Sequence, residues 1–428
     1  MKQPVLILGV EPRISIPIAR SLHRQGVRVD MASVSASEPH LRSKAVRHFE
    51  RLPGNEDPSS FCEAITSLIS RRKYDMLIPA TDAALAVIGE HDAKLREVAY
   101  VACPPADIVQ RILNKGITLD FARRAGIRAP RTFRISSLSE LKVISHELEF
   151  PVIAKPSHKS SETDFKVRYF QDYETLCGAL AADDQLARRV LLQEFVQGDG
   201  VGVEALMHRG EPIAMFQHRR LKEVPSTGGA AAVAIAEPLE PFLSDQAVAL
   251  LRALEWEGVA MVEFRYDRSH RQSALMEVNG RYWGTLALPI KAGIDFPWYE
   301  WQIAHGERPS VQRTYSVGLR WRWTAGYVRR WHGVVAGSVK RALKRPGALR
   351  EVIPSLADLS PFTHDALWSF ADPVPAISEG FRQAKKLLSS DAWSVLRKVL
   401  RHRPRKGTGY SNRLATSEHT AEKSKIHA

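Results

Sequence analysis

The segment at 259–284 constrains the fold of this chain most strongly. Residues 259–267 and 274–284 are rich in β-branched, aromatic and other apolar residues, and the polar stretch 268–272 separates them. This pattern predicts two strands joined by a turn. We therefore expect a β-hairpin here, whose side chains alternate between its two faces.

One face of the predicted hairpin is unusually polar. Because strand side chains alternate with a period of two, Glu277, Asn279 and Arg281 share a face of the second strand. Met276 is expected on the opposite face, and Glu263 can lie across from the polar one. Two carboxylates and an amide oxygen suit a hard cation such as Mg²⁺, which takes oxygen ligands and usually bridges to phosphates. An ordinary solvated strand face has the same pattern, so both interpretations stand at this point.

The composition is that of a globular chain with excess positive charge. Of the 428 residues, 44% are hydrophobic and 25% are charged, which suits a soluble protein of two or three domains. Lys and Arg number 61 against 47 Asp and Glu, and this balance of +14 suits an anionic partner. We see no apolar run of membrane-spanning length and no signal peptide. The three cysteines lack metal-ligand spacing and fit a reducing cytoplasm.

The first hundred residues predict a parallel α/β sheet, because strand and helix patterns alternate. The expected strands are 5–9, 27–31, 74–79 and 99–102, and the expected helices are 14–25 and 61–70. The segment after the first strand lacks the second and third glycines of a dinucleotide-binding fingerprint. We therefore expect a scaffold with a small-substrate pocket rather than a nicotinamide or flavin site.

The middle of the chain has a mixed pattern of strands and helices. Strands are expected at 152–156, 165–170, 190–196, 201–207 and 212–217, and helices at 108–126, 138–148, 173–182 and 245–255. Lys155 ends an apolar strand, where a lysine is costly to bury unless it faces an anion. The polar segment 157–163 that follows contains no glycine.

Taken together, the order and spacing of these motifs resemble the ATP-grasp superfamily, with the closest likeness to biotin carboxylase and short carbamoyl-phosphate-synthase-like proteins. The resemblance covers roughly residues 1 to 305. It implies a pre-ATP-grasp parallel α/β domain at 1–110 and a two-lobed ATP-grasp domain, of α/β and α+β class, at 111–307. A basic, Trp-containing helical extension is expected at 308–401, and a disordered tail at 402–428.

The resemblance also implies roles for individual residues. Those matched to ATP binding, including a hinge strand that recognises adenine, are Lys115, Lys155, Gln193, Glu194, Phe195, Val196, Glu204 and Gln217. Those matched to the metal ligands are Glu263, Glu277 and Asn279. Those matched to the reaction centre are Lys222 and Arg281, the latter as the arginine that holds the transferring group.

The chemistry implied by the resemblance is ATP-dependent activation of a carboxylate. With Mg²⁺ or Mn²⁺, a small-molecule carboxylate attacks the γ-phosphate, and an amine takes the resulting acyl phosphate. Catalysis is expected from positioning and charge neutralisation. The segment 157–163 departs from the family, which covers the phosphates with a glycine-rich loop. The alternative is a protein that binds ATP as a structural or regulatory ligand at a membrane-associated assembly, without ligase turnover.

The segment 308–345 concentrates the positive charge of the chain. It contains ten Lys and Arg residues and no Asp or Glu, and its last part, 327–345, has helical apolar spacing. Trp321, Trp323 and Trp331 are interleaved with the cations. Such a segment suits peripheral contact with an anionic membrane, or a helix packed on the protein with a solvated basic face. Nucleic-acid binding is not expected, because no known binding module accompanies the charge. We expect a cytoplasmic protein, with the inner membrane face as a further location.

Overall fold

The N-terminal part of the protein forms a parallel sheet. The structure is a computed structural model that describes residues 2–34, 42–53, 58–156, 167–183, 190–224, 229–312, 314–331, 360 and 363–388. Five parallel strands, in the order β3-β2-β1-β4-β5, are β1 (Val5–Leu8), β2 (Val29–Ser33), β3 (Phe49–Arg51), β4 (Met76–Pro79) and β5 (Tyr100–Val101). All four residues of β1 are buried, as expected for a strand covered on both faces. The predicted parallel α/β sheet is confirmed.

Six helices accompany these strands and lead out of the sheet. They are α1 (Pro12–Arg24), α2 (Pro58–Arg72), α3 (Asp82–Glu90), α4 (Asp92–Arg96), α5 (Ala106–Leu113) and α6 (Lys115–Arg124). The sequence predicted one helix at 108–126, whereas the structure divides it at Asn114. The Asn114 side chain accepts hydrogen bonds from the backbone N–H groups of Gly116 and Ile117, which caps α6. Lys115 is therefore the first residue of a helix.

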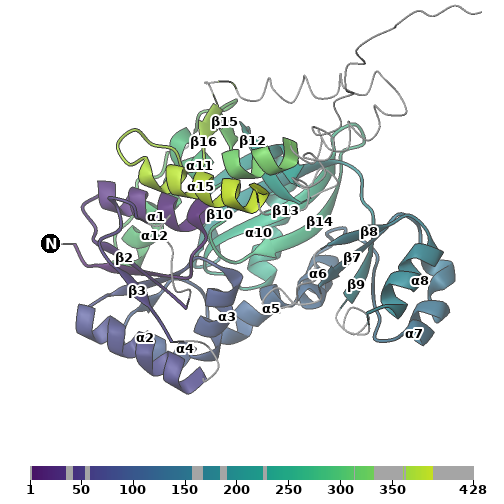
Figure 1. Cartoon of the computed structure of the whole chain (residues 1–428), viewed down its shortest axis with the longest axis horizontal. Helices are drawn as coiled ribbons and strands as arrows, with labels where there is room; N and C mark the ends of the chain where they lie inside the picture. The colour runs from purple at the N-terminus through teal and green to yellow at the C-terminus, as the bar shows by residue number, and fades with distance from the viewer. Residues whose placement is uncertain are drawn as a thin grey trace, which may run out of the picture. The chain divides into compact units, whose positions relative to one another are not determined.

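A small antiparallel sheet forms a separate layer. Its strands, in the order β6-β9-β7-β8, are β6 (Thr132–Arg134), β7 (Val152–Pro156), β8 (Arg168–Phe170) and β9 (Val190–Glu194). The helices α7 (Leu138–Val143) and α8 (Tyr173–Ala181) lie together beside it (Figure 1). Leu141 of α7 and Leu176 of α8 are fully buried against Leu192 of β9, so the sheet has its own small core.

The largest sheet contains the predicted hairpin. Its seven strands, in the order β14-β13-β10-β11-β12-β15-β16, are β10 (Asp199–His208), β11 (Glu211–Val224), β12 (Ala230–Glu237), β13 (Gly258–Asp267), β14 (Gln272–Asn279), β15 (Arg320–Arg322) and β16 (Thr363–Asp365). All neighbours are antiparallel except β15 and β16. The helices that follow or cover these strands are α10 (Pro241–Ala253), α11 (Ala287–Ala292), α12 (Phe296–Ala304) and α15 (Val374–Leu388).

A β-bulge interrupts the hairpin at Met276. Glu263 pairs with Glu277, but the next residue, Phe264, pairs with Leu275, so Met276 is an extra residue on β14. Leu275 and Val278 are fully buried, whereas Met276 is only partly buried. The prediction that Met276 faces away from Glu277 is therefore wrong, because the bulge breaks the simple alternation.

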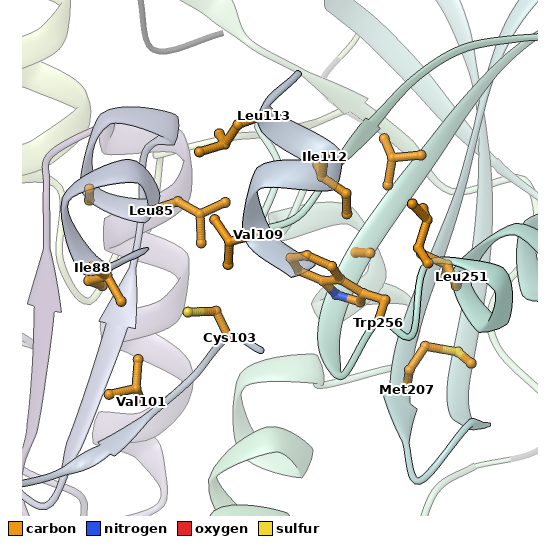
Figure 2. Close-up of a cluster of buried hydrophobic side chains, with 14 of the residues drawn as sticks. Leu85, Ile88, Val101, Cys103, Val109, Ile112, Leu113, Met207, Leu251 and Trp256 are labelled. Atoms are coloured by element: carbon orange, nitrogen blue, oxygen red, sulfur yellow. The ribbon is translucent and has the colours of Figure 1, made fainter. Parts of the chain in front are cut away.

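A continuous hydrophobic core joins the first sheet to the large one. Val109 and Ile112 of α5 lie between Leu85 of α3 and Trp256, which precedes β13 (Figure 2). Trp256 is 1% exposed and its indole N–H donates to the Val259 carbonyl at 3.1 Å. Contacts of this kind make Met1–Gly380 one compact unit, and Phe381–Ala428 is a second one of which 381–388 is described. The predicted domain boundaries at 110 and 307 stay predictions.

The start of the predicted basic extension belongs to the large sheet. Trp321 of β15 is 1% exposed in the core, and residues 324–331 are helical. The rest of the predicted basic helix, the segment 157–163 and the tail at 402–428 lie outside the described residues. In the part of the chain that the structure describes, no helix is long and apolar enough to cross a membrane. Contact of 308–345 with an anionic membrane stays a prediction.

Candidate functional site

A cavity of about 490 Å³ opens among the three sheets. Its walls come from β7, β8 and the segment after β9, from β10 to β14 of the large sheet, and from the loops that follow β1 and β4. Many of the predicted site residues line it: Lys115, Lys155, Phe195, Val196, Glu263, Glu277, Asn279 and Arg281. Gln193, Glu194, Glu204, Gln217 and Lys222 are not among the described residues that line it.

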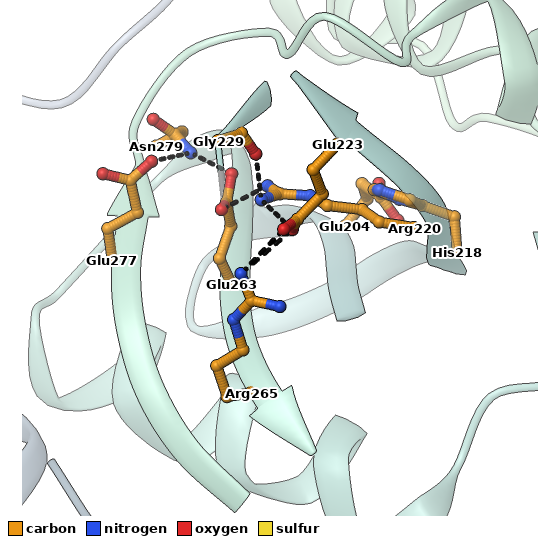
Figure 3. Close-up of polar contacts among 9 residues, drawn as sticks. All are labelled: Glu204, His218, Arg220, Glu223, Gly229, Glu263, Arg265, Glu277 and Asn279. Atoms are coloured by element: carbon orange, nitrogen blue, oxygen red, sulfur yellow. Dashed lines mark hydrogen bonds and ion pairs between the residues drawn. The ribbon is translucent and has the colours of Figure 1, made fainter. Parts of the chain in front are cut away.

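The hairpin brings the three predicted metal ligands together. Glu263 and Glu277 occupy paired positions on β13 and β14. The Asn279 amide nitrogen donates to a carboxylate oxygen of each, at 3.0 Å to Glu263 and 3.2 Å to Glu277 (Figure 3). Glu263 and Asn279 are 9% and 4% exposed. The three side chains thus form one compact oxygen-rich group at the cavity wall.

This group fits a hard divalent cation by the chemistry of its donors. Two carboxylates at paired strand positions and one amide supply oxygens, and rotating the Asn279 amide would present its oxygen to the cation. Within the described residues, no group of three or more His, Cys, Asp or Glu side chains could hold a metal alone. A cation bound here would therefore complete its shell with water or phosphate oxygens, as Mg²⁺ commonly does.

Two lysines face the hairpin from the small sheet and α6. Lys155 of β7 donates to the Gln193 side chain at 2.6 Å, and Lys115 donates to the Pro156 carbonyl at 3.3 Å. Burial, together with repulsion from Lys115, lowers the pKa of Lys155 to about 8, although Glu277 and Glu263 act in the opposite direction. A buried ammonium beside another cation favours binding of an anion, which would restore its charged form.

The predicted adenine hinge is the end of β9. Phe195 and Val196 line the cavity, and the Phe195 ring meets Tyr169 edge-on at 6.4 Å. Gln193 instead points to Lys155, and its amide also donates to the Thr132 hydroxyl at 3.1 Å. The Glu194 carboxylate is paired with Arg128 and Arg131, both at 3.3 Å. The hinge therefore presents its last two residues, Phe195 and Val196, to the cavity.

Comparison with known proteins adds to this geometry. The family model described as "ATP-grasp in the biosynthetic pathway with Ter operon" matches residues 187–326. The L-amino acid ligase from Bacillus licheniformis has a TM-score of 0.57 at 19% identity, over 71% of this chain and 74% of that one. The biotin carboxylase domain of Hydrogenobacter thermophilus 2-oxoglutarate carboxylase has a TM-score of 0.58 at 16% identity, over 74% and 73%.

Residues 187–326 match an ATP-grasp family model, and the chain shares its fold with these two structures. The phosphoribosylglycinamide synthetase from Anaerococcus prevotii has the same fold, with a TM-score of 0.54 at 16% identity, over 73% of this chain and 79% of that one. Urea amidolyase of Saccharomyces cerevisiae is 25% identical over 229 residues, which is 49% of this chain but only 12% of that protein. At these identities the solved structures establish only the fold that this chain shares with them.

A network of arginine and glutamate side chains next to the predicted metal ligands was not predicted from the sequence. Arg220 of β11 forms ion pairs with Glu263 and Glu223, and Arg265 binds Glu223 at 3.1 and 2.9 Å to its two oxygens (Figure 3). Arg220 is 13% exposed, so the two charges that it joins are largely removed from water. The network positions the Glu263 side chain at the cavity wall.

Alternation along β11 explains where the predicted residues on this strand lie. His218 and Arg220 line the cavity, whereas Gln217 points the other way and accepts a hydrogen bond from the Glu240 backbone N–H at 2.9 Å. A register shift between Arg220 and Lys222 then disturbs the alternation. The periodicity was visible in the sequence, but it does not reveal which of the two faces meets the cavity.

Glu204 is completely buried and bonded to the neighbouring strand. Its carboxylate lies 2.5 Å from His218 Nδ1, and both residues are at most 1% exposed. Burial raises the pKa of Glu204, and the nearby His218 opposes this change. Gly202 makes room for the imidazole, because a Cβ there would lie 2.4 Å from His218 Cε1. Glu204 therefore orients His218 at the cavity wall.

Arg281 leads to a second end of the cavity that sequence reasoning missed. Its guanidinium donates to the Tyr282 carbonyl and to Asp82 of α3, both at 2.8 Å. Arg13, at the start of α1, donates to Glu11 at 2.7 Å and lies 3.8 Å above the Trp323 ring. These residues are far apart in the sequence, and no local pattern links them. The only signal was the expectation of a small-substrate pocket at the ends of the parallel strands.

Proposed function

We propose that this protein is an ATP- and Mg²⁺-dependent ligase that activates a carboxylate as an acyl phosphate and joins it to an amine. The observation that carries the proposal is the placement of two lysines opposite two paired glutamates and an asparagine across one cavity. Triphosphate charge beside two carboxylates requires cations between them, and this cavity supplies both lysine and a site for a divalent ion.

The roles follow from the position of each group. Lys115 and Lys155 neutralise phosphate oxygens, and the backbone at Phe195 and Val196 recognises adenine. Gln193 fixes Lys155 through the hydrogen bond between them. Glu263, Glu277 and Asn279 would hold Mg²⁺, which supplies charge neutralisation on the phosphates when bound. The roles of Glu194, Glu204 and Gln217 in ATP binding, and of Lys222 at the reaction centre, stay predictions, because none of these four residues is among those that line the cavity.

The reaction consists of two substitutions. An oxygen of the substrate carboxylate bonds to the γ-phosphorus while the bond to the β,γ-bridging oxygen breaks, and ADP leaves. The amine nitrogen then bonds to the acyl carbon, phosphate leaves, and the nitrogen loses a proton. Arg281 holds the carboxylate and then the planar acyl group in bidentate fashion. Rate enhancement comes from alignment and from cationic groups around the transferred phosphoryl group.

In this proposal the domains keep the predicted boundaries. Residues 1–110 contribute the substrate end of the cavity together with 281–285, and the rest of 111–307 contributes the nucleotide end. The proposed location is the cytoplasm, where ATP and Mg²⁺ are available. The similar structures include an amino acid ligase and a carboxylase domain, and these activities support a carboxylate as the activated group.

Release of ADP is the decisive measurement. The full chain is mixed with ATP and Mg²⁺ and with pools of carboxylates and amines, and ADP is followed by a coupled assay. We expect ADP release in at least one pool that contains both substrates, and less when either is omitted. If ATP and Mg²⁺ bind but no pool yields ADP, the ligase proposal fails and ATP acts as a structural or regulatory ligand.

A further inference from the structure

The cavity end around Arg13 is distinct in its chemistry from the end that contains the lysines and the metal ligands. Its residues come from the loop after β1, the start of α3, the segment after β14 and the end of β15. We propose that this end is a subsite for a carboxylate carried by one of the two substrates, in addition to the carboxylate that is activated, and that Arg13 determines specificity for it. This inference rests on the proposed ligase function.

Arg13 is fixed in place yet has donors to spare. Its guanidinium lies on Trp323, at 3.8 Å from the ring centroid, and its Nε–H donates to Glu11. Its side chain is only 15% exposed. Within the described part of the chain, its two terminal nitrogens have no hydrogen-bond acceptor. These nitrogens form the end of the guanidinium that binds a carboxylate in bidentate fashion.

Gly284 allows Arg13 to approach the segment after β14. A Cβ at Gly284 would lie 3.0 Å from Nη1 of Arg13, so a larger residue there would push the guanidinium away. Gly284 follows Arg281 closely in the sequence. The positive charges of Arg281 and Arg13 both lower the pKa of Glu11. The two arginines therefore serve the same end of the cavity.

Two further buried donors line this end without partners. The Trp283 indole N–H and the Thr285 hydroxyl have no hydrogen-bond partner among the described residues, and these side chains are 0% and 4% exposed. Both groups can donate, and neither side chain brings a negative charge to this end of the cavity.

The N-terminus of α1 adds to the preference for an anion. Glu11 is the N-cap residue of this 13-residue helix, but its side chain caps no backbone N–H group. Instead it pairs with Arg13 Nε, and this pairing holds the pKa of Glu11 below its ordinary value although burial acts to raise it. The positive end of the helix dipole and the free fork of Arg13 therefore favour a negative group at the same place.

Matched pairs of substrates test the subsite. Acceptors are compared with and without a carboxylate, as glycine against methylamine. Activated substrates are compared with and without a second carboxylate, as succinate against butyrate. We expect Arg13→Met to lower kcat/KM by about 10- to 100-fold, mainly through KM, only for the carboxylate-bearing member of one of these pairs. The pair that responds identifies which substrate carries the group.

Two variants serve as references. Arg24→Met removes an arginine from the same helix at a position that is 55% exposed and outside the cavity lining, and it should leave the substrate preference unchanged. Arg13→Lys keeps the charge but loses the fork, so an intermediate loss is expected. If Arg13→Met does not fold, the substrate preference of Arg13→Lys is measured in its place. Equal effects of Arg13→Met on both members of each pair would overturn the proposal.

A binding measurement separates this inference from the ligase proposal. The full chain is melted with each compound in the absence of ATP. The carboxylate-bearing member should raise Tm for the wild type but not for Arg13→Met, and binding of ATP with Mg²⁺ should be the same in both. This outcome supports the subsite even if no ADP release is found. The subsite is refuted if the carboxylate-bearing compound raises Tm equally in the wild type and in Arg13→Met. It is also refuted if both members of each pair raise the Tm of the wild type equally.

Discussion

The two ends of the cavity are built in opposite ways. At the metal end, Glu263 and Glu277 face each other on one hairpin, and Arg220 of β11, on the far side of β10, pairs with Glu263. At the other end arginines face the cavity and carboxylates compensate them, as Glu11 does for Arg13 and Asp82 for Arg281. The first end suits a cation between phosphates, and the second suits an anion. The contrast supports the proposed placement of the nucleotide at one end and of the substrate at the other.

The largest expected effect tests the acidic end directly. Glu277→Gln keeps the shape of the side chain but removes one of the two carboxylate charges. We expect kcat for ADP release to fall by about 10³-fold or more, because the divalent ion loses a charged ligand. Circular dichroism and melting should show a retained fold. Glu211→Gln, on β11 with a 68% exposed side chain, is the control. Unchanged turnover in Glu277→Gln would refute the metal assignment.

The second test asks whether Arg220 acts as an internal counterion for Glu263. Arg220→Met leaves Glu263 largely buried without its partner, so the free energy of unfolding should fall by about 3 kcal/mol. Urea denaturation measures this loss, and millimolar Mg²⁺ should restore part of it. Arg252→Met breaks an exposed ion pair with Glu211 and should cost less than about 1 kcal/mol. Equal losses in the two variants would contradict this role of Arg220.

The third test concerns the proton on Lys155. Its pKa falls from the ordinary 10.5 to about 8 in the folded chain, so the unfolded chain binds more protons between those values. Stability without nucleotide should therefore rise as pH increases from about 8 to 10.5. Phosphate favours the charged lysine, so ATP binding at pH 8 should take up about 0.5 proton.

Calorimetry in buffers of different ionisation enthalpy measures this proton uptake. It should vanish in Lys155→Met and persist in Lys94→Met, where the lysine is exposed on α4. If the uptake is the same in Lys155→Met as in the wild type, another group takes up the proton and the assignment of Lys155 to the phosphates loses its support.

The smallest expected effect separates two neighbouring residues of the hinge. Glu194→Gln should change KM for ATP by less than about 3-fold, because this carboxylate pairs with Arg128 and Arg131 at the protein surface. Phe195→Ala should raise KM by about 10-fold, because this ring lines the cavity. Steady-state kinetics compares the two, and a larger effect of Glu194→Gln would show that the carboxylate reaches the nucleotide.

The metal end was accessible from the sequence because its geometry is local. Strand alternation placed Glu277 and Asn279 on one face, and the short turn placed Glu263 opposite. The same rule gave a wrong position for Met276, since a bulge depends on the packing of both strands and leaves no signature in the local pattern. On β11, alternation distinguished two sets of residues but not which set faces the cavity, so His218 and Arg220 were missed.

The arginine end was not accessible because it depends on long-range packing. Arg13 follows the first strand, Asp82 begins α3, and Trp323 follows β15. Only the assembled fold brings the three together. The general architecture was easier to predict: the parallel sheet follows from the alternation of strand and helix patterns, and the ATP-grasp motifs were identified by their resemblance to a known family. The division of one predicted helix at Asn114 was missed, although asparagine is a favoured N-cap residue.

The position of β15 has a consequence for how this protein is synthesised. Its partner β12, with the sequence AAAVAIAE, has β11 on one side and β15 on the other. While the ribosome has delivered the chain only as far as residue 307, β12 is an edge strand of the large sheet, and its apolar, unpaired edge is a template for pairing with other nascent chains. Translation through Asp365 provides both closing strands. Truncated forms that end near 307 should therefore aggregate during expression, even though most of the residues that line the cavity are already present.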